Sequence, residues 1–322
     1  MRTIEDTLRY QADAAAHKVE ATAHPGRYAV QAMLAGAYIG VGVVLMVSAA
    51  GPMLAAGDPL AKLVSGLVFG VALTFVVFAG GELATSNMMT LTQGAVMGSI
   101  TWWRGIGTLA FSFAANLVGA LVFAGLVVAS RVLHSNPDAG AMLATMLEGK
   151  AHETPVELFV RGVLCNLLVC LAIWMCARLT NEVVKVIVIF AAILAFITSG
   201  FEHVVANMTT YAIGLFSGVE DATLALFANN LLWVGLGNLV GGAMIVGLGY
   251  WVVGGRPKTA AALAVEASGE TPGEAFDEAG AAPRVERDLA AFVPATALDE
   301  TVAPAGAAPT PVGARSAGRD GG

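Results

Sequence analysis

The sequence predicts an all-α integral membrane protein with six transmembrane helices, arranged as an inverted 3+3 repeat with breaks in the second and fifth helices. Three observations support this fold class. The 322 residues have a mean hydropathy of +0.72, and 57% are hydrophobic while 13% are charged, which excludes an ordinary soluble globular domain. Six long apolar windows and an internal sequence repeat are the other two observations.

Each of the six windows is apolar over a length that can cross the hydrocarbon core of a bilayer. They cover residues 28–50, 60–81, 106–132, 158–178, 183–200 with a continuation past the glycine, and 224–253. Lys and Arg concentrate on one side of these windows, whereas Lys62, Arg131 and Lys150 flank the other side. Because cytoplasmic loops carry the excess of positive charge, we expect both termini in the cytoplasm.

Two segments flank this six-span domain of residues 28–254. Residues 1–27 carry apolar side chains on one helical face and charges on the other, which predicts an amphipathic helix along the cytoplasmic surface. The apolar face consists of Ile4, Leu8, Ala12, Ala15 and Val19. Residues 255–322 change abruptly to Ala, Gly, Pro, Thr and acidic residues, a composition that predicts a disordered cytoplasmic tail.

The internal repeat relates FAGGELATSNMMT at residues 78–90 to TSGFEHVVANMTT at residues 198–210. A shift of 120 positions places Gly80 on Gly200, Glu82 on Glu202 and Asn87 on Asn207. A second pair of segments, both reading Asn-Leu-Val-Gly, begins at Asn116 and Asn238. Three spans per repeat turn the second copy upside down relative to the first, as in many transporters.

The glycines of the repeat are the expected break points of the second and fifth helices. Irregular backbone at membrane depth must be buried in protein or line a water-filled cavity, so the two segments should meet around a pathway. A half-helix that begins after Gly200 would direct its free N–H groups and positive dipole end into this pathway, which favours an anion. His203 lies at the same place and can donate a hydrogen bond or a proton.

Ionisable groups at this depth cost roughly 2.5 kcal/mol or more, so His203 is a functional candidate. The alternative is a histidine that hydrogen-bonds between helices without a further role. Glu202 lies about 100° around a helix from His203, so we expect Glu202 and its repeat partner Glu82 to hold backbone in place. Asn87 and Asn207 are expected to satisfy the backbone groups that each break leaves free.

No residue pattern indicates a metal site, a cofactor or a nucleic-acid partner. Cys165, Cys170 and Cys176 lie in one apolar window at a spacing that fits no zinc or redox motif, so we expect them to pack in the interior. A membrane-embedded enzyme that uses Glu202 and His203 as acid and base is the weakest functional alternative, because no nucleophile, metal cluster or nucleotide loop accompanies them. The sequence therefore predicts that the protein is not an enzyme.

Four motifs resemble those of the formate/nitrite transporter family, and most of all its nitrite channel branch. They are GELATSNMMTLTQG, RGVLCNLLVCLAIWM, GFEHVVANMT and NLLWVGLGNLVGG, and the resemblance extends over residues 1–253. It implies an aquaporin-like protomer within a homopentamer in the bilayer of a bacterial inner membrane, with one pore in each protomer. The implied substrates are small monovalent anions of weak acids, nitrite first and formate second, and no cofactor is implied.

The resemblance also implies roles for individual residues. His203 matches the central histidine, and Lys150 matches the basic residue that draws anions into the outer vestibule. The implied pore centre also includes Thr85, Asn166 and Asn207. The implied outer constriction consists of Phe69 and Phe196, and the inner one of Leu73, Leu83 and Val169.

One departure from the family pattern concerns the inner constriction. Leu83, Ala84 and Thr85 match the omega-shaped loop that breaks the second span, and Ala84 stands where relatives commonly have Phe. The tightness of the inner constriction is therefore open. Two further questions also stay open: whether the proton leaves His203 with the substrate, and whether the protein is instead a neutral-solute facilitator of the aquaporin type.

Overall fold

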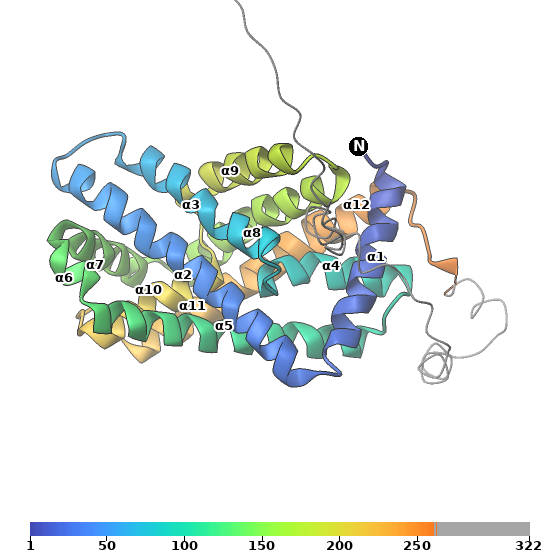
Figure 1. Ribbon diagram of the computed structural model, residues 1–322, viewed down its shortest axis with the longest axis horizontal. Helices are drawn as coiled ribbons and strands as arrows, with labels where there is room; N and C mark the ends of the chain where they lie inside the picture. The colour runs from blue at the N-terminus through green and yellow to red at the C-terminus, as the bar shows by residue number, and fades with distance from the viewer. Residues whose placement is uncertain (261, 263–322) are drawn as a thin grey trace, which may run out of the picture. The chain divides into compact units, whose positions relative to one another are not determined.

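The computed structural model describes residues 1–260 and 262 (Figure 1). Within this part of the chain the regular elements are helices. The predicted tail, residues 255–322, falls almost entirely outside the described residues. The prediction that this tail is disordered thus concerns residues outside the described part of the chain.

The first half of the described chain contains five helices, which begin and end where the sequence supplies caps. Thr3 and Thr101 accept hydrogen bonds from backbone N–H groups in the first turns of their helices, and Pro25 occupies the first position of another. The helices are α1 (Ile4–Ala21), α2 (Pro25–Ala55), α3 (Ala61–Phe78), α4 (Ala84–Met97) and α5 (Trp102–Ser130).

The second half contains the remaining elements, and its longest single α-helix also begins at a side-chain cap. Thr154 and Glu157 form a reciprocal capping box before a long helix that starts at Pro155. The elements are α6 (Val132–Ser135), α7 (Pro137–His152), α8 (Pro155–Arg178), α9 (Glu182–Thr198), α10 (Val204–Ser217), α11 (Leu224–Leu239), the π-helix η1 (Val240–Leu248) and α12 (Gly249–Val253).

Five helical segments of the described chain are long and apolar enough to cross a membrane. They are α2, α3, α5, α8 and the continuous segment from α11 through α12. The window predicted at residues 183–200 forms α9, which has 17 residues and is followed by the apolar α10 of 14 residues. The protein is thus a multi-pass membrane protein in which one apolar window is divided between two shorter helices.

Two glycines separate neighbouring helices at corresponding places. Gly80 lies between α3 and α4 with φ of +74°, and Gly200 lies between α9 and α10 with φ of +75°. This left-handed conformation is one that a residue with a Cβ adopts only with strain, so glycine is the natural occupant. The chain therefore turns sharply at both sites, and each turn is followed by a new helix.

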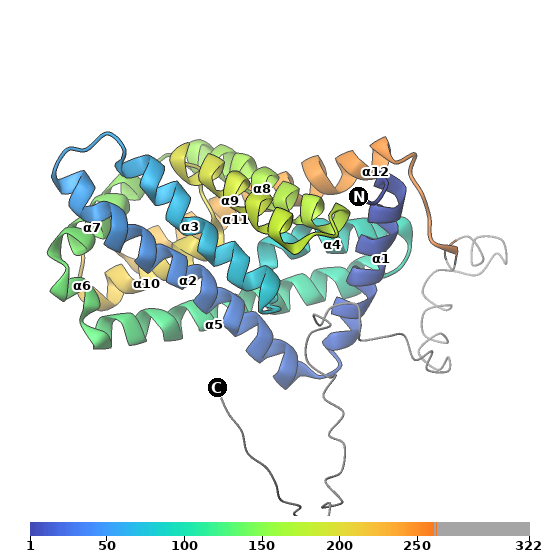
Figure 2. The same cartoon turned by 45° about the horizontal axis from the view of Figure 1, so that its top comes forward.

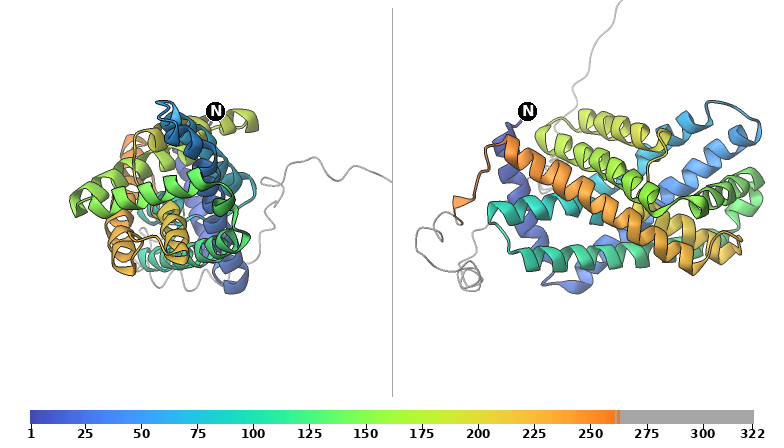
Figure 3. Two further views of the ribbon diagram at one scale, coloured as in Figure 1. Left: turned by 90° about the vertical axis from the view of Figure 1, so that its left-hand side faces the viewer. Right: turned by 180° about the vertical axis from the view of Figure 1, so that it is seen from behind.

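The two helices that follow these glycines are buried on all sides. Every residue of α10 from Val204 to Gly214 is buried, and almost all of α4 is buried as well. Helices α2, α5 and α11 pack on α10, and α5, α8 and η1 pack on α4 (Figures 1 and 3). Helices α4 and α10 form the centre of the fold because their side chains are buried, including the polar ones of α4.

Small residues allow the long helices to approach closely. A Cβ on Gly36 would lie 2.1 Å from the Asn116 carbonyl oxygen, and one on Gly237 would lie 2.1 Å from the Phe159 carbonyl oxygen. Both distances are far below contact, so the α2–α5 and α8–α11 crossings require glycine. Both glycines belong to small-residue pairs spaced four apart.

The amphipathic helix α1 buries Leu8, Ala12, Ala15 and Val19, which are four residues of the predicted apolar face. This face packs mainly on α4, so its partner is the protein itself. Helix α7 packs on α2 and α10 at the opposite end of the bundle (Figure 2). Each of the two buried helices thus has a helix that is not a candidate membrane span packed beside it, α1 on α4 and α7 on α10.

Candidate functional site

The backbone around the first glycine turn is held by Asn116 of α5. Its Oδ1 accepts a hydrogen bond from the Ala84 backbone N–H at 2.8 Å. Its Nδ2 donates to the carbonyl oxygens of Glu82 at 2.8 Å and Ala32 at 2.7 Å. One buried amide therefore joins α2, the turn and the start of α4.

Asn238 of α11 makes the same three hydrogen bonds at the second turn. Its Oδ1 accepts from the Val204 N–H at 2.9 Å, and its Nδ2 donates to the carbonyl oxygens of Glu202 at 2.9 Å and Gly162 at 2.8 Å. The expectation that Asn87 and Asn207 satisfy the freed backbone is therefore wrong. That task falls to the asparagines of the Asn-Leu-Val-Gly segments, because their helices pass directly beside the turns.

The Glu82 carboxylate binds an ammonium group and an amide. Lys18 of α1 donates to both of its oxygens at 2.7 and 2.8 Å, and Asn87 Nδ2 donates at 3.2 Å. The side chain of Lys18 is 21% exposed and that of Glu82 is 12% exposed. The pair links α1 to the first glycine turn.

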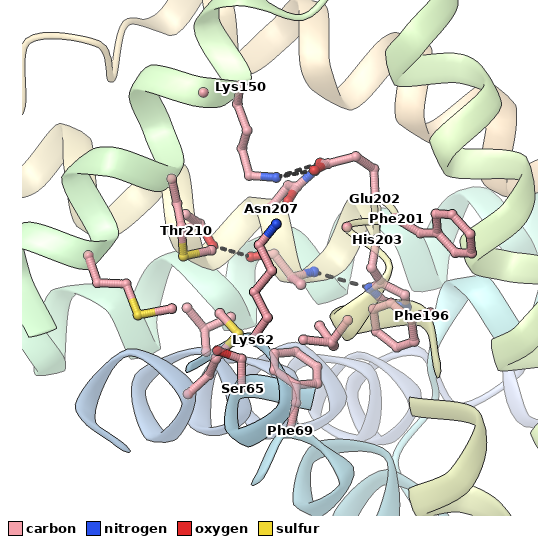
Figure 4. A pocket seen from close by; sticks show the side chains of 18 of the residues that line it. Lys62, Ser65, Phe69, Lys150, Phe196, Phe201, Glu202, His203, Asn207 and Thr210 are labelled. Carbon is pink, nitrogen blue, oxygen red and sulfur yellow. Dashed lines mark hydrogen bonds and ion pairs between the residues drawn. The ribbon is translucent and has the colours of Figure 1, made fainter. Parts of the chain in front are cut away.

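The Glu202 carboxylate has the same kinds of partner in the other half. Lys150 of α7 donates to both oxygens at 2.5 Å, and Asn207 Nδ2 donates at 2.6 Å (Figure 4). This ion pair is more buried, with Lys150 9% and Glu202 7% exposed. The expectation that Glu82 and Glu202 hold backbone is thus wrong for their side chains, whose oxygens bind lysine and asparagine.

His203 is the N-cap residue of α10, and its ring nitrogens have different partners. The Ala206 backbone N–H donates to Nδ1 at 3.2 Å, which requires a lone pair on Nδ1. In a neutral ring the proton is then on Nε2, which lies 3.1 Å from Thr85 Oγ1. Since an amide N–H can only donate, this contact fixes the tautomer. The Nε2–H then donates to the Thr85 hydroxyl, and a ligand would have to take the place of that acceptor.

The start of α10 also differs from the sequence-based expectation. The N–H groups of Val204 and Ala206 are occupied by Asn238 and by His203 itself. They are therefore not available to an anion, which weakens the attraction of this helix end.

A cavity of about 410 Å³, the outer cavity, extends from the end of the bundle where α7 lies to His203 (Figure 4). Phe69 and Phe196 border it and meet edge to face, with ring centroids 6.0 Å apart. The Phe196 ring also stacks on the His203 imidazole at 6.1 Å. The two phenylalanines of the implied outer constriction and His203 are thus brought together at the closed end of the cavity.

Of the other residues of the implied pore, Asn207 borders this cavity, whereas Thr85 and Asn166 do not. Asn166 Nδ2 donates to the Thr85 carbonyl oxygen at 3.1 Å and to the Asn238 carbonyl oxygen at 2.7 Å. Leu73, Leu83 and Val169 are buried in the same apolar cluster as the two phenylalanines, and Ala84 is also fully buried. They do not border the outer cavity.

The outer cavity contains polar residues that the sequence-based reasoning did not single out. Arg161 of α8 pairs with Glu153, and Lys62 at the start of α3 borders the mouth. Burial raises the pKa of the Glu153 carboxyl, the Glu202 carboxylate raises it further, and Lys150 and Arg161 oppose this rise. The sequence contains only weak signals for these two residues. Arg161 begins one of the motifs that resemble the family, and Lys62 lies on the side of the spans that has fewer Lys and Arg residues.

A family model described as formate/nitrite transporter matches residues 5–252. The chain is 41% identical over 249 residues to the nitrite transporter NirC of Escherichia coli strain K12, covering 76% of this chain and 91% of the relative. The chain belongs to the formate/nitrite transporter family. The predicted family and its nitrite branch are thereby confirmed.

Other members of the family are also similar. The chain is 31% identical over 253 residues to the formate channel FocA of Escherichia coli strain K12, covering 73% of this chain and 88% of that one. A solved structure titled FNT family ion channel superposes with a TM-score of 0.72 at 37% identity, over 77% of this chain and 98% of its own. A solved pentameric formate channel with formate bound has a TM-score of 0.63 at 28% identity and covers 72% and 98%. The names of these relatives are those of transporters and channels.

Proposed function

We propose that this protein is a transmembrane channel for small monovalent anions of weak acids, with nitrite as the first substrate and formate as the second. The observation that carries this proposal is a buried histidine, His203, that borders a cavity together with Phe69 and Phe196 and whose neutral ring carries its proton on Nε2. A single buried donor in apolar surroundings suits a small anion that has one or two acceptor atoms. Membership in the formate/nitrite transporter family supports the same substrates.

The anion enters the cavity from the outer side and loses water as it reaches the two phenylalanines. This desolvation is costly for a bare charge, so a hydrogen-bond donor must replace the lost water. His203 Nε2–H is that donor, and the hydroxyl of Thr85 beside it supplies a second one. Hydrogen bonds to charged acceptors contribute about 1.5–3 kcal/mol each, and more in dry surroundings, which allows the anion to pass.

The hydrogen bond from Ala206 to Nδ1 also bears on proton coupling. An imidazolium would carry a proton on Nδ1, which would face the Ala206 N–H and lose this bond. We therefore favour a neutral His203 that donates a hydrogen bond over one that gives up a proton from an imidazolium. On this account the protein is a passive anion channel.

The inverted architecture is part of the proposal. We assign α3 with α4 as the broken second span and α9 with α10 as the broken fifth span of an aquaporin-like 3+3 repeat, within the membrane domain of residues 28–254. The matching hydrogen bonds of Asn116 and Asn238 support this assignment. Leu73, Leu83 and Val169, with the small Ala84, form the inner constriction beyond Thr85.

The assembly and location follow the relatives. We propose a homopentamer with one pore through each protomer, because a solved formate channel that covers most of this chain is pentameric. The bacterial origin of these relatives favours a bacterial inner membrane, and the Lys and Arg distribution supports both termini in the cytoplasm. In this orientation the cavity that leads to His203 opens to the periplasm.

The test is side-by-side flux through proteoliposomes that contain the full chain. We expect rapid uptake of nitrite and formate, no chemical change in either, and no sustained change of internal pH. Swelling in a glycerol gradient without anion uptake would favour a neutral-solute facilitator, and conversion of the substrate would favour an enzyme. Stoichiometric proton entry with nitrite would replace the passive channel with a proton-coupled one.

A further inference from the structure

The charges around the outer cavity do not balance. Three cationic side chains border it, Lys62, Lys150 and Arg161, against the two carboxylates of Glu153 and Glu202. Each carboxylate is already paired, Glu202 with Lys150 and Glu153 with Arg161. Within residues 1–260 and 262, no carboxylate lies in ion-pair distance of Lys62.

Lys62 stands at the mouth of the cavity. It belongs to the first turn of α3, and its carbonyl oxygen accepts a hydrogen bond from Thr198 Oγ1 at the end of α9 at 3.4 Å. Figure 4 shows its side chain extending into the cavity toward Asn207 and the Lys150–Glu202 pair. The residue is exposed, so its ammonium group is accessible to water and to an approaching anion.

The paired cations are poorly placed to capture an anion. Lys150 donates to both oxygens of Glu202 at 2.5 Å, so at a distance the two charges largely cancel. Moving Lys150 to an incoming anion would leave the Glu202 carboxylate buried without its partner, which is costly. Arg161 is held by Glu153 in the same way. An unpaired ammonium has no such competitor.

We propose that Lys62 is the residue that captures the anion at the outer mouth and passes it to His203. Lys150 is then a positioning residue that holds Glu202, and through it Asn207, in place. The site takes a small monovalent oxyanion such as nitrite or formate. This inference rests on the proposed anion-channel function, and it replaces Lys150 by Lys62 as the source of the attraction.

Charge at position 62 can be switched chemically. The Lys62→Cys variant of the full chain is placed in right-side-out vesicles and treated with impermeant methanethiosulfonates that carry either a trimethylammonium or a sulfonate group. The native cysteines at positions 165, 170 and 176 are buried, so wild-type protein treated with the same reagents serves as the reagent control. Arg131→Cys is the matched variant, because Arg131 is an exposed cation on the same side that does not border this cavity.

The readout is the initial rate of nitrite uptake at nitrite concentrations far below saturation. We expect Lys62→Cys to lower this rate about two- to fivefold at low ionic strength, as an exposed charge a few ångströms from the path would do. The cationic reagent should restore it and the anionic one should lower it further. In high salt the three states should converge, since exposed charges are screened beyond about 8–10 Å. Arg131→Cys should respond to neither reagent.

The outcomes separate the two proposals. Absence of nitrite uptake by the wild-type protein would overturn the channel itself. Normal wild-type uptake combined with equal rates after the cationic and anionic reagents would overturn the role of Lys62 alone. A rate that Lys150→Met lowers in a salt-dependent way, while Lys62→Cys leaves it unchanged, would return the capture role to Lys150.

Discussion

The turns at Gly80 and Gly200 have the same scaffold but different side chains at the helix start. In both, an asparagine makes three hydrogen bonds to the turn, and a glutamate binds a lysine and a second asparagine. The N-cap residue of α4 is Leu83, which has no side-chain hydrogen bond there, whereas that of α10 is His203. The repeat thus supplies the framework twice, and one of its halves carries the ring that can bind an anion.

A second difference lies in the ion pairs. Lys150 and Glu202 are more deeply buried than Lys18 and Glu82. Lys150 and Glu202 border the cavity that leads to His203, whereas Lys18 and Glu82 join α1 to the first glycine turn. The hydrogen-bond framework is therefore what the two turns share, and burial distinguishes their ion pairs.

The largest expected effect concerns the framework. Replacing Asn116 or Asn238 by Ala removes three hydrogen bonds and leaves buried backbone groups without partners, so each should lower the free energy of unfolding by about 2–4 kcal/mol. Because the two sites are equivalent, the two losses should be similar. Thermal unfolding of the purified protein in detergent measures them, with the exposed cap variant Asn181→Ala as control. A loss at one site only would break the equivalence.

A smaller and unequal effect is expected for the carboxylates. Glu202→Gln leaves the buried Lys150 without its anion, whereas Glu82→Gln leaves the more exposed Lys18 partly hydrated. We expect a loss of about 2–3 kcal/mol for the outer pair and about 1 kcal/mol for the inner pair. The same unfolding measurement compares them. Equal losses would mean that burial does not distinguish the two halves.

The smallest expected effect concerns Glu153, whose raised pKa affects the charge of the outer cavity. Glu153→Gln removes one negative charge, so nitrite uptake at low concentration should rise about twofold near neutral pH. As the pH falls toward the raised pKa, the wild-type carboxyl gains a proton and the difference should disappear. Uptake measured from pH 7.5 to 5 tests this, with the exposed Glu148→Gln as control. A difference that grows on acidification would contradict it.

Much of the fold could be predicted from residue patterns. Gly80 and Gly200 were predictable as break points because a left-handed turn favours glycine, and the buried face of α1 followed from helical periodicity. The placement of His203 at the start of α10 followed from the same glycine. These features depend on residues close together in the sequence.

The features that could not be predicted depend on contacts between distant segments. Lys18 meets Glu82 across 64 positions, and Lys150 meets Glu202 across 52. Nothing in the sequence shows that Lys150 is paired and Lys62 is not, so the charge of the cavity could not be assigned. The scaffold role of Asn116 and Asn238 was likewise hidden, although their repeated motif marked the right residues.

The most direct test of the account is the initial rate of nitrite uptake by the His203→Leu variant. This change gives the second turn the N-cap residue of the first and removes the buried donor. The account predicts at least a tenfold loss of uptake, the effect of one hydrogen bond to a charged acceptor, with the oligomer and its thermal unfolding preserved. Uptake equal to that of the wild type in a folded His203→Leu protein would contradict it.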